Sequence, residues 1–168
     1  MVTKLYNAKA KLLVMSLALA LLVGYFVFAA PVPAQAADKF EGMTLAEVQQ
    51  QILKETNAYR KSKGVKALKL STKMNTVAVN WSKSQAKSKK MSHNPKYSSQ
   101  IPKGWTAAGE NVAYGYAPKA VTKAWWNSPG HKANMLNKKY NYIGIGIAKD
   151  SSGRFYYTQV FGAYSKTP

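Results

Sequence analysis

The chain of 168 residues contains no cysteine. A disulfide framework is therefore excluded, and packing alone must hold the folded part together. Acidic residues are also scarce, because Asp and Glu together number 6 against 25 for Lys and Arg. Between Thr56 and Lys149 the only acid is Glu110, which stands in a Gly-Glu-Asn triplet. An isolated carboxylate in so basic a stretch is a candidate functional group.

Arginine is rare as well, since Arg60 and Arg154 are the only two in the chain. A lysine ammonium lacks the planar fork with which arginine binds phosphates and base edges bidentately. We therefore expect no sequence-specific nucleic-acid recognition. The formal net charge of +19 instead predicts attraction to an anionic cell-wall polymer or an anionic lipid surface. The alternative is that the lysines form a solvated surface without a partner.

The N-terminus has the pattern of a secretory signal peptide. Three lysines precede an apolar run over residues 12–30, and an Ala34-x-Ala36 cleavage pattern follows it. We predict that residues 1–36 are a signal peptide. Because the run is close to the ~20 residues that cross a bilayer, an uncleaved membrane anchor is the alternative. Either way we expect an exported chain, secreted to the extracellular side or retained at the cell envelope.

Removal of residues 1–36 leaves 22 basic and 6 acidic residues, a net charge of +16. The remaining length fits a single domain. We expect a short tether over residues 37–43, one domain over residues 44–164 and a tail over residues 165–168.

Local patterns predict helices first and an antiparallel hairpin last, which is typical of an α+β layer fold. Thr44 and Glu47 form a capping box at the start of the first helix, and Lys63-Gly64 ends it. Ser71 is the expected N-cap of the second helix, whose expected buried stripe is Met74, Val77, Ala78 and Trp81. An irregular segment is expected from Met91 to about Glu110, followed by helices over residues 118–127 and 129–136. Two strands are expected last, one through Ile143 and Ile145 and one over residues 155–161.

Two histidines and the lone acid are the candidate site residues. His93 and His131 lie on either side of Glu110 in the sequence. Two imidazoles and a carboxylate suit a zinc ion, or a proton-transfer pair in which Glu110 orients a histidine. Their spacing matches no local metal motif, so the alternative of purely structural groups stays open.

Ser128 lies three residues before His131 and is a candidate nucleophile. The chain has no Gly-x-Ser-x-Gly elbow, however. Ser128-Pro129 instead has the pattern of a helix N-cap followed by proline at the first helical position. We predict the capping role.

Five motifs stand in the order found in CAP-domain proteins, a superfamily that includes the cysteine-rich secretory proteins, the antigen 5 proteins and the plant pathogenesis-related proteins of class 1. The sequence over about Leu45 to Tyr164 resembles this family, and its bacterial secreted branch in particular. The motifs are Ser92-His93-Asn94, Gly109 to Ala113, Trp126 to Leu136 with its Ser-Pro-Gly-His segment, Ile143 to Gly146, and Tyr156 to Gly162.

The resemblance implies a three-layer αβα sandwich whose central cleft, in the animal and plant branches, holds two histidines and two glutamates and often binds zinc. His93 and Glu110 match one histidine and one glutamate. This chain departs from the other two positions, where it has Ser128 and Tyr156. The Ser-Pro-Gly-His form of the bacterial branch implies that His131 faces the same cleft. The implied cleft residues are His93, Glu110, Asn111, Ser128, His131 and Tyr156.

Three functional hypotheses follow. The first is an envelope-associated module that binds an unidentified small or polymeric ligand in a His/Glu cleft. The second is a metal-assisted, peptidase-like hydrolase with His93, Glu110 and His131 as catalytic or zinc-binding residues. The third, known for some members of the family, is carriage of a lipid or sterol.

Overall fold

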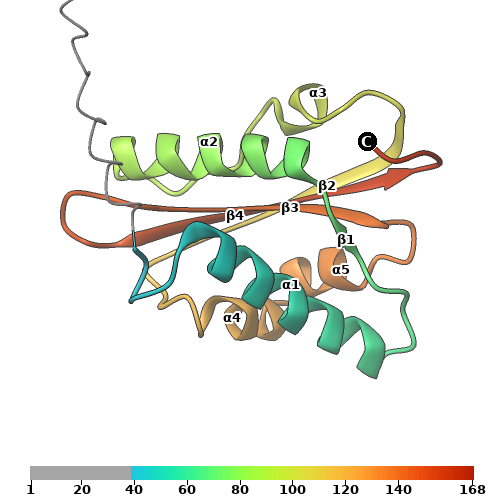
Figure 1. The fold of residues 1–168 in the computed structure, drawn as a ribbon, viewed down its shortest axis with the longest axis horizontal. Coiled ribbons are helices and arrows are strands. Elements are labelled where there is room, and N and C mark those ends of the chain that lie inside the picture. The colour runs from blue at the N-terminus through green and yellow to red at the C-terminus, as the bar shows by residue number, and fades with distance from the viewer. Residues whose placement is uncertain (1–38) are drawn as a thin grey trace, which may run out of the picture. The chain divides into compact units, whose positions relative to one another are not determined.

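The structure, a computed structural model, describes residues 39–168, so the predicted signal peptide over residues 1–36 lies outside the described residues. The elements are α1 (Leu45–Ser62), β1 (Lys69–Leu70), α2 (Thr72–Ser88), α3 (Tyr97–Gln100), β2 (Trp105–Tyr114), α4 (Val121–Asn127), α5 (Pro129–Leu136), β3 (Tyr142–Lys149) and β4 (Phe155–Tyr164). A four-stranded sheet lies between two helical layers, α2 on one face and α1, α4 and α5 on the other (Figure 1). The predicted α+β class and three-layer αβα arrangement are confirmed. No helix in the described part has both the length and the apolar character needed to cross a bilayer.

The strand order in the sheet is β1-β3-β4-β2. β3 and β4 form the predicted antiparallel hairpin, with Ile145 opposite Gln159. β2 pairs antiparallel with the other side of β4, and this register sets Glu110 opposite Val160. β2 is therefore an edge strand, and it brings the Gly-Glu-Asn motif to the border of the sheet.

Local capping signals start the first two helices as predicted. The Thr44 side chain accepts the Glu47 N–H, and the Glu47 side chain accepts the Thr44 N–H, which completes the capping box of α1. The Ser71 hydroxyl accepts a backbone N–H in the first turn of α2. The third predicted helix is shorter than expected, because α4 begins at Val121 and not at Pro118.

The buried surface of α2 differs from the predicted stripe. Val77 and Trp81 are half-buried, and the buried positions include Ser82 and Gln85. Both polar side chains donate to the Thr158 hydroxyl of β4, at 3.0 and 3.2 Å. These polar residues are tolerated in the interior because each has a hydrogen-bond partner.

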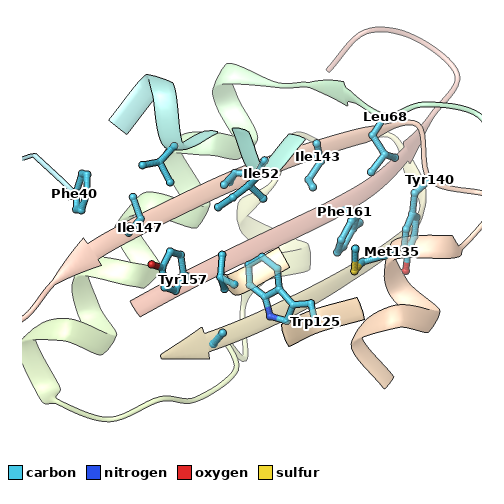
Figure 2. Packing of buried hydrophobic residues seen from close by; sticks show 14 of the residues in the cluster. Phe40, Ile52, Leu68, Trp125, Met135, Tyr140, Ile143, Ile147, Tyr157 and Phe161 are labelled. Carbon is cyan, nitrogen blue, oxygen red and sulfur yellow. The ribbon is translucent and has the colours of Figure 1, made fainter. Parts of the chain in front are cut away.

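Most of the core lies between the sheet and the α1 layer. Ile143 and Ile147 of β3 lie on this side with Tyr157 and Phe161 of β4, in one buried cluster with Trp125 of α4, whose ring meets that of Tyr157 edge-on (Figure 2). Each of these five side chains is at most 1% exposed. Burial of a side chain of this size contributes about 1.5–3 kcal/mol, so this cluster holds the sheet to α1 and α4.

Glycines alternate with isoleucines in β3 because α2 lies directly against the strand. A Cβ on Gly146 would overlap the backbone carbonyl of Ala78 in α2. We predict that Gly146→Ala lowers the free energy of unfolding by about 3 kcal/mol, measured by urea denaturation. The control is Gly130→Ala in α5, where a Cβ meets nothing within 4 Å and the change should stay below about 1 kcal/mol. Equal losses in the two variants would contradict the close approach of α2.

The segment predicted to be irregular contains regular structure. The stretch before Glu110 contains α3 and the first half of β2, which starts at Trp105. Residues 107–109 are small, so the alternation of apolar and polar side chains that is typical of a strand is weak there. Hydrogen bonding to β4 makes this segment a strand. The predicted tether contributes Phe40 to the core, 4% exposed and with its ring centroid 6.1 Å from that of Phe155.

Candidate functional site

The outer edge of β2 is closed by side chains from α4 and α5. Asn134 Nδ2 donates to Glu110 O at 3.0 Å, and Trp125 Nε1 donates to Val112 O at 3.1 Å. Carbonyls on an edge strand otherwise offer acceptors to a further strand. These contacts also fix α5, which carries His131, beside the strand that carries Glu110.

The lone acid recognised in the sequence is buried, with a side chain 1% exposed. Glu110 Oε1 accepts the Asn94 N–H at 2.9 Å and lies 2.8 Å from His93 Nδ1. Among the described residues, Glu110 Oε2 has no hydrogen-bond partner. A buried polar atom without a partner costs free energy, so Oε2 is an unusual group in the interior of a folded protein.

Burial raises the pKa of Glu110 above its ordinary value, because the charged form loses hydration; the hydrogen bonds from Asn94 and His93 act against this rise. The charge of Glu110 acts on Tyr97, whose pKa is raised first by burial and second by this carboxylate. The His93 side chain is 64% exposed. The site therefore combines a buried carboxyl with an imidazole that solvent and ligands reach.

His131 lies in the first turn of α5, and its Nδ1 is 2.9 Å from Ser128 Oγ. Ser128 is the N-cap residue and Pro129 holds the first helical position, as predicted, but the Ser128 hydroxyl makes no capping hydrogen bond. The pKa of His131 is lowered, mainly because burial disfavours the imidazolium and in part because of the charge of His93. The His131 ring is therefore mostly neutral near pH 7.

A hollow of about 260 Å³ lies beside β2 and is lined by Ser128 and His131. Met91, Tyr114 and Tyr116 also line it, and each of these three side chains is 45–47% exposed. Large apolar groups exposed around a few polar ones are typical of a ligand site. Met91 stands two residues before His93 in the sequence, so one loop borders the hollow and also supplies the partner of Glu110.

The family model that matches this chain is described as CAP: Cysteine-rich secretory protein family, and the match covers residues 53–161. The chain belongs to the CAP family. Two Bacillus subtilis (strain 168) proteins resemble this CAP chain: YkwD, 30% identical over 117 residues, and the membrane protein YlbC, 34% identical over 121 residues. The matches cover 65% and 67% of this chain but 46% and 34% of the relatives. The chain thus spans less than half the length of either relative.

Solved structures share the fold. An outer surface protein from Borrelia burgdorferi has a TM-score of 0.65 at 20% identity, covering 71% of this chain and 94% of its own. An extracellular SCP-domain protein from Bacillus anthracis has a TM-score of 0.60 at 27% identity, covering 71% and 41%. A cysteine-rich secretory protein from Staphylococcus aureus has a TM-score of 0.58 at 23% identity, covering 74% and 41%.

The residues of this CAP domain do not fit a zinc ion held by the family tetrad. Ser128 and Tyr156 stand where the second glutamate and second histidine are expected, and a hydroxyl is not among the usual zinc ligands. Among residues 39–168, no group of three or more His, Asp or Glu side chains is placed to hold a metal ion. Of the three predicted ligands, Glu110 contacts His93, whereas His131 contacts Ser128 and feels the charge of His93.

The other two predicted cleft residues support the fold. Asn111 is fully buried, and its Nδ2 donates to His131 O and Gln159 Oε1, both at 3.1 Å. Tyr156 is 1% exposed, and its hydroxyl donates to Asp150 Oδ2 at 3.3 Å near the hairpin turn. Asn111 therefore positions α5, whereas Tyr156 lies at the start of β4 and ties this strand to Asp150 at the hairpin turn.

Three residues of the CAP site were not singled out from the sequence. Asn94 and Asn134 lie within the motifs that carry the resemblance, so their place beside His93 and His131 was an available signal. Tyr97 lies in the segment predicted to be irregular, and no sequence pattern linked it to Glu110.

We predict that Glu110→Gln stabilises the domain at neutral pH. The folded-state pKa of Glu110 is raised above 4.5, so its protonation favours folding at low pH, and this contribution is lost as the pH rises through the raised pKa. Glutamine stays uncharged, so the difference in Tm between variant and wild type should grow above pH ~4.5. Thermal unfolding across this range measures it, with Glu55→Gln as the control. A variant less stable than wild type at neutral pH would contradict the prediction that the buried charge of Glu110 destabilises the fold.

Proposed function

We propose that this CAP-domain protein is secreted and associates with the cell envelope by binding an anionic cell-wall polymer through its lysines. One observation carries the proposal. Of the twenty lysines from Lys39 onwards, all are exposed except Lys132, which is half-buried. The ion pairs in the described part are His93–Glu110 and Arg154–Asp150, and neither uses a lysine. The lysine charge is therefore available to a partner.

The distribution of these lysines favours a polymer over a flat lipid surface. α1 carries Lys54 and Lys61, and α2 on the opposite face of the sheet carries Lys83 and Lys87 (Figure 1). A bilayer contacts one face of a small domain, whereas a flexible polymer reaches both. Long-range attraction between unlike charges also speeds the encounter.

The His93–Glu110 pair supplies a second, more selective contact. Glu110 Oε2 is buried without a partner in the described part, and the exposed ring of His93 lies next to it. A protonated Glu110 donates a hydrogen bond and an ionised one accepts, so the pair suits a polar group such as a hydroxyl or amide. We assign this contact to a small or polymeric ligand of the envelope.

The location of related proteins agrees with an envelope role. The Bacillus anthracis structure is of an extracellular protein, and the Borrelia burgdorferi structure is of an outer surface protein. For a metal-assisted hydrolase, no group of three or more His, Asp or Glu side chains among the described residues is placed to hold a metal ion.

The test is sedimentation of the purified protein with a phosphate-bearing wall polymer at rising salt. Because exposed charges are screened beyond ~8 Å at physiological ionic strength, affinity should fall at least about tenfold between low and high salt. A neutral polysaccharide and anionic phospholipid vesicles are the comparisons. An affinity that does not fall with salt concentration, or binding to the vesicles alone, would refute polymer attachment through lysines.

A further inference from the structure

The hydroxyl of Ser128 is not used by the helix that it precedes. Its backbone is extended, with φ −100° and ψ 120°, and Pro129 follows at the first helical position, yet no side-chain cap is formed. The hydroxyl instead lies 2.9 Å from His131 Nδ1. A capping serine stabilises its helix by about 1 kcal/mol, and that contribution is absent here.

Three features around Ser128 match the parts of an acyl-transfer site. The first is the neighbouring imidazole, whose Nδ1 lies 2.9 Å from the Ser128 hydroxyl and is placed to accept its proton. The second is the hollow of about 260 Å³ that Ser128 and His131 line together. The third is the first turn of α5, where the N–H groups of Gly130 and His131 lack a side-chain acceptor from Ser128.

We propose that Ser128 and His131 form a nucleophile–base pair that hydrolyses short-chain acyl esters of a hydroxylated carrier in this hollow. The proposal is independent of polymer attachment through the lysines. It also differs from the metal-assisted hydrolase, because it uses neither Glu110 nor a metal.

The reaction runs in two steps that balance. Ser128 Oγ bonds to the acyl carbon while its proton passes to His131 Nδ1, and the carbonyl oxygen becomes negative beside the N–H groups of the first turn of α5. The bond from the acyl carbon to the alcohol oxygen then breaks, and that oxygen takes the proton. In the second step water attacks the acyl carbon of the Ser128 ester and gives a proton to His131 Nδ1. The bond from the acyl carbon to Ser128 Oγ then breaks, Oγ takes the proton back from Nδ1, and the carboxylic acid leaves.

The surroundings select the substrate class. In the described part, no residue hydrogen-bonds to His131 Nε2, so the imidazolium lacks the orienting carboxylate of a full triad. An ester has a better leaving group than an amide and depends less on strong base catalysis. The small hollow limits the acyl chain to a few carbons, and the exposed rings of Tyr114 and Tyr116 offer flat surfaces to a sugar-like carrier.

The test is covalent labelling of the full chain with a fluorophosphonate, in which Oγ bonds to phosphorus and fluoride leaves. Peptide mass mapping should place the adduct on Ser128, and Ser128→Ala should abolish it. His131→Gln should slow labelling by about 10²-fold, the usual contribution of a general base. Hydrolysis of p-nitrophenyl acetate should follow the same order across the variants.

Ser84→Ala is the matched control, because Ser84 is an exposed serine of α2 and its loss should change neither rate. Labelling of the wild-type chain is informative even if a variant folds poorly. A folded wild-type chain without an adduct on Ser128 would overturn the proposal. So would an adduct that forms at the same rate in His131→Gln.

Discussion

Replacement of Arg60 by methionine should unfold the domain or leave it barely stable. Arg60 is fully buried in α1 and donates to four backbone carbonyls, at 2.7–3.0 Å. The acceptors are Lys66 O, Met135 O, Asn137 O and Tyr140 O. Methionine fills a similar volume but donates nothing, so these carbonyls lose their donors. With about 1.5–3 kcal/mol for a hydrogen bond to a charged group, the loss should reach at least about 4 kcal/mol. Native domains have only ~5–15 kcal/mol in total.

Arg154→Met is the natural control for this result, because Arg154 is the other arginine and its side chain is 51% exposed. Its ion pair with Asp150 is partly solvated and should contribute no more than about 1 kcal/mol. Arg60→Lys should also fail, because a single ammonium has three donors and no fork to span four acceptors. Urea unfolding separates the variants. Similar stability for Arg60→Met and Arg154→Met would contradict the role assigned to the buried guanidinium.

Arg60 also shows that the charge of a residue does not predict its exposure in this protein. It stands among exposed lysines, and the sequence offers no sign that it is buried. Three of its acceptors lie at the end of α5 or in the following loop, more than seventy residues away. A contact between such distant segments has no local signature. Burial lowers the pKa of Arg60, but an arginine stays charged at physiological pH. Its guanidinium therefore keeps all its N–H donors for the four carbonyls.

The elements predicted correctly are those with local signals. The capping box at Thr44 and the proline at the start of α5 are short patterns that act on adjacent backbone groups. β2 was partly missed because its first half is rich in small residues, and it is defined by pairing with β4, about fifty residues later. Strand pairing over that separation is a tertiary effect, which propensity does not report.

The candidate site was predicted in part for the same reason. The contact between His93 and Glu110 followed from the family resemblance, since spacing alone gave no metal or catalytic motif. The pairing of Ser128 with His131 was considered from the sequence but set below helix capping, because a serine before a proline usually caps a helix. Which alternative a hydroxyl adopts depends on the side chains that pack around it, and the sequence of α5 alone does not fix those.

The largest functional effect should come from four lysines that surround one hollow at the end of α2. This hollow has a volume of about 550 Å³ and an apolar floor, and its lysines are Lys83, Lys87, Lys89 and Lys149. Asp150 also lines it, and the hydrogen bonds that hold its carboxylate, from Ser152 above all and from Arg154, lower its pKa, so the four lysines face a single negative charge. One segment of polymer therefore meets four positive charges at once.

Replacing these four lysines with glutamine should weaken binding of the wall polymer by roughly 10³-fold at low salt. The figure follows from about 1 kcal/mol for each lysine near an anionic surface, and from 1.4 kcal/mol for each factor of ten. A second variant neutralises four exposed lysines taken from separate segments: Lys54, Lys69, Lys103 and Lys138. It has the same net charge but no cluster. Its loss should be at least tenfold smaller, because these four lysines lie on separate segments and one stretch of polymer does not contact all of them together. Equal losses in the two variants would mean that the polymer responds to net charge alone, and the hollow at the end of α2 would then have no special part in attachment.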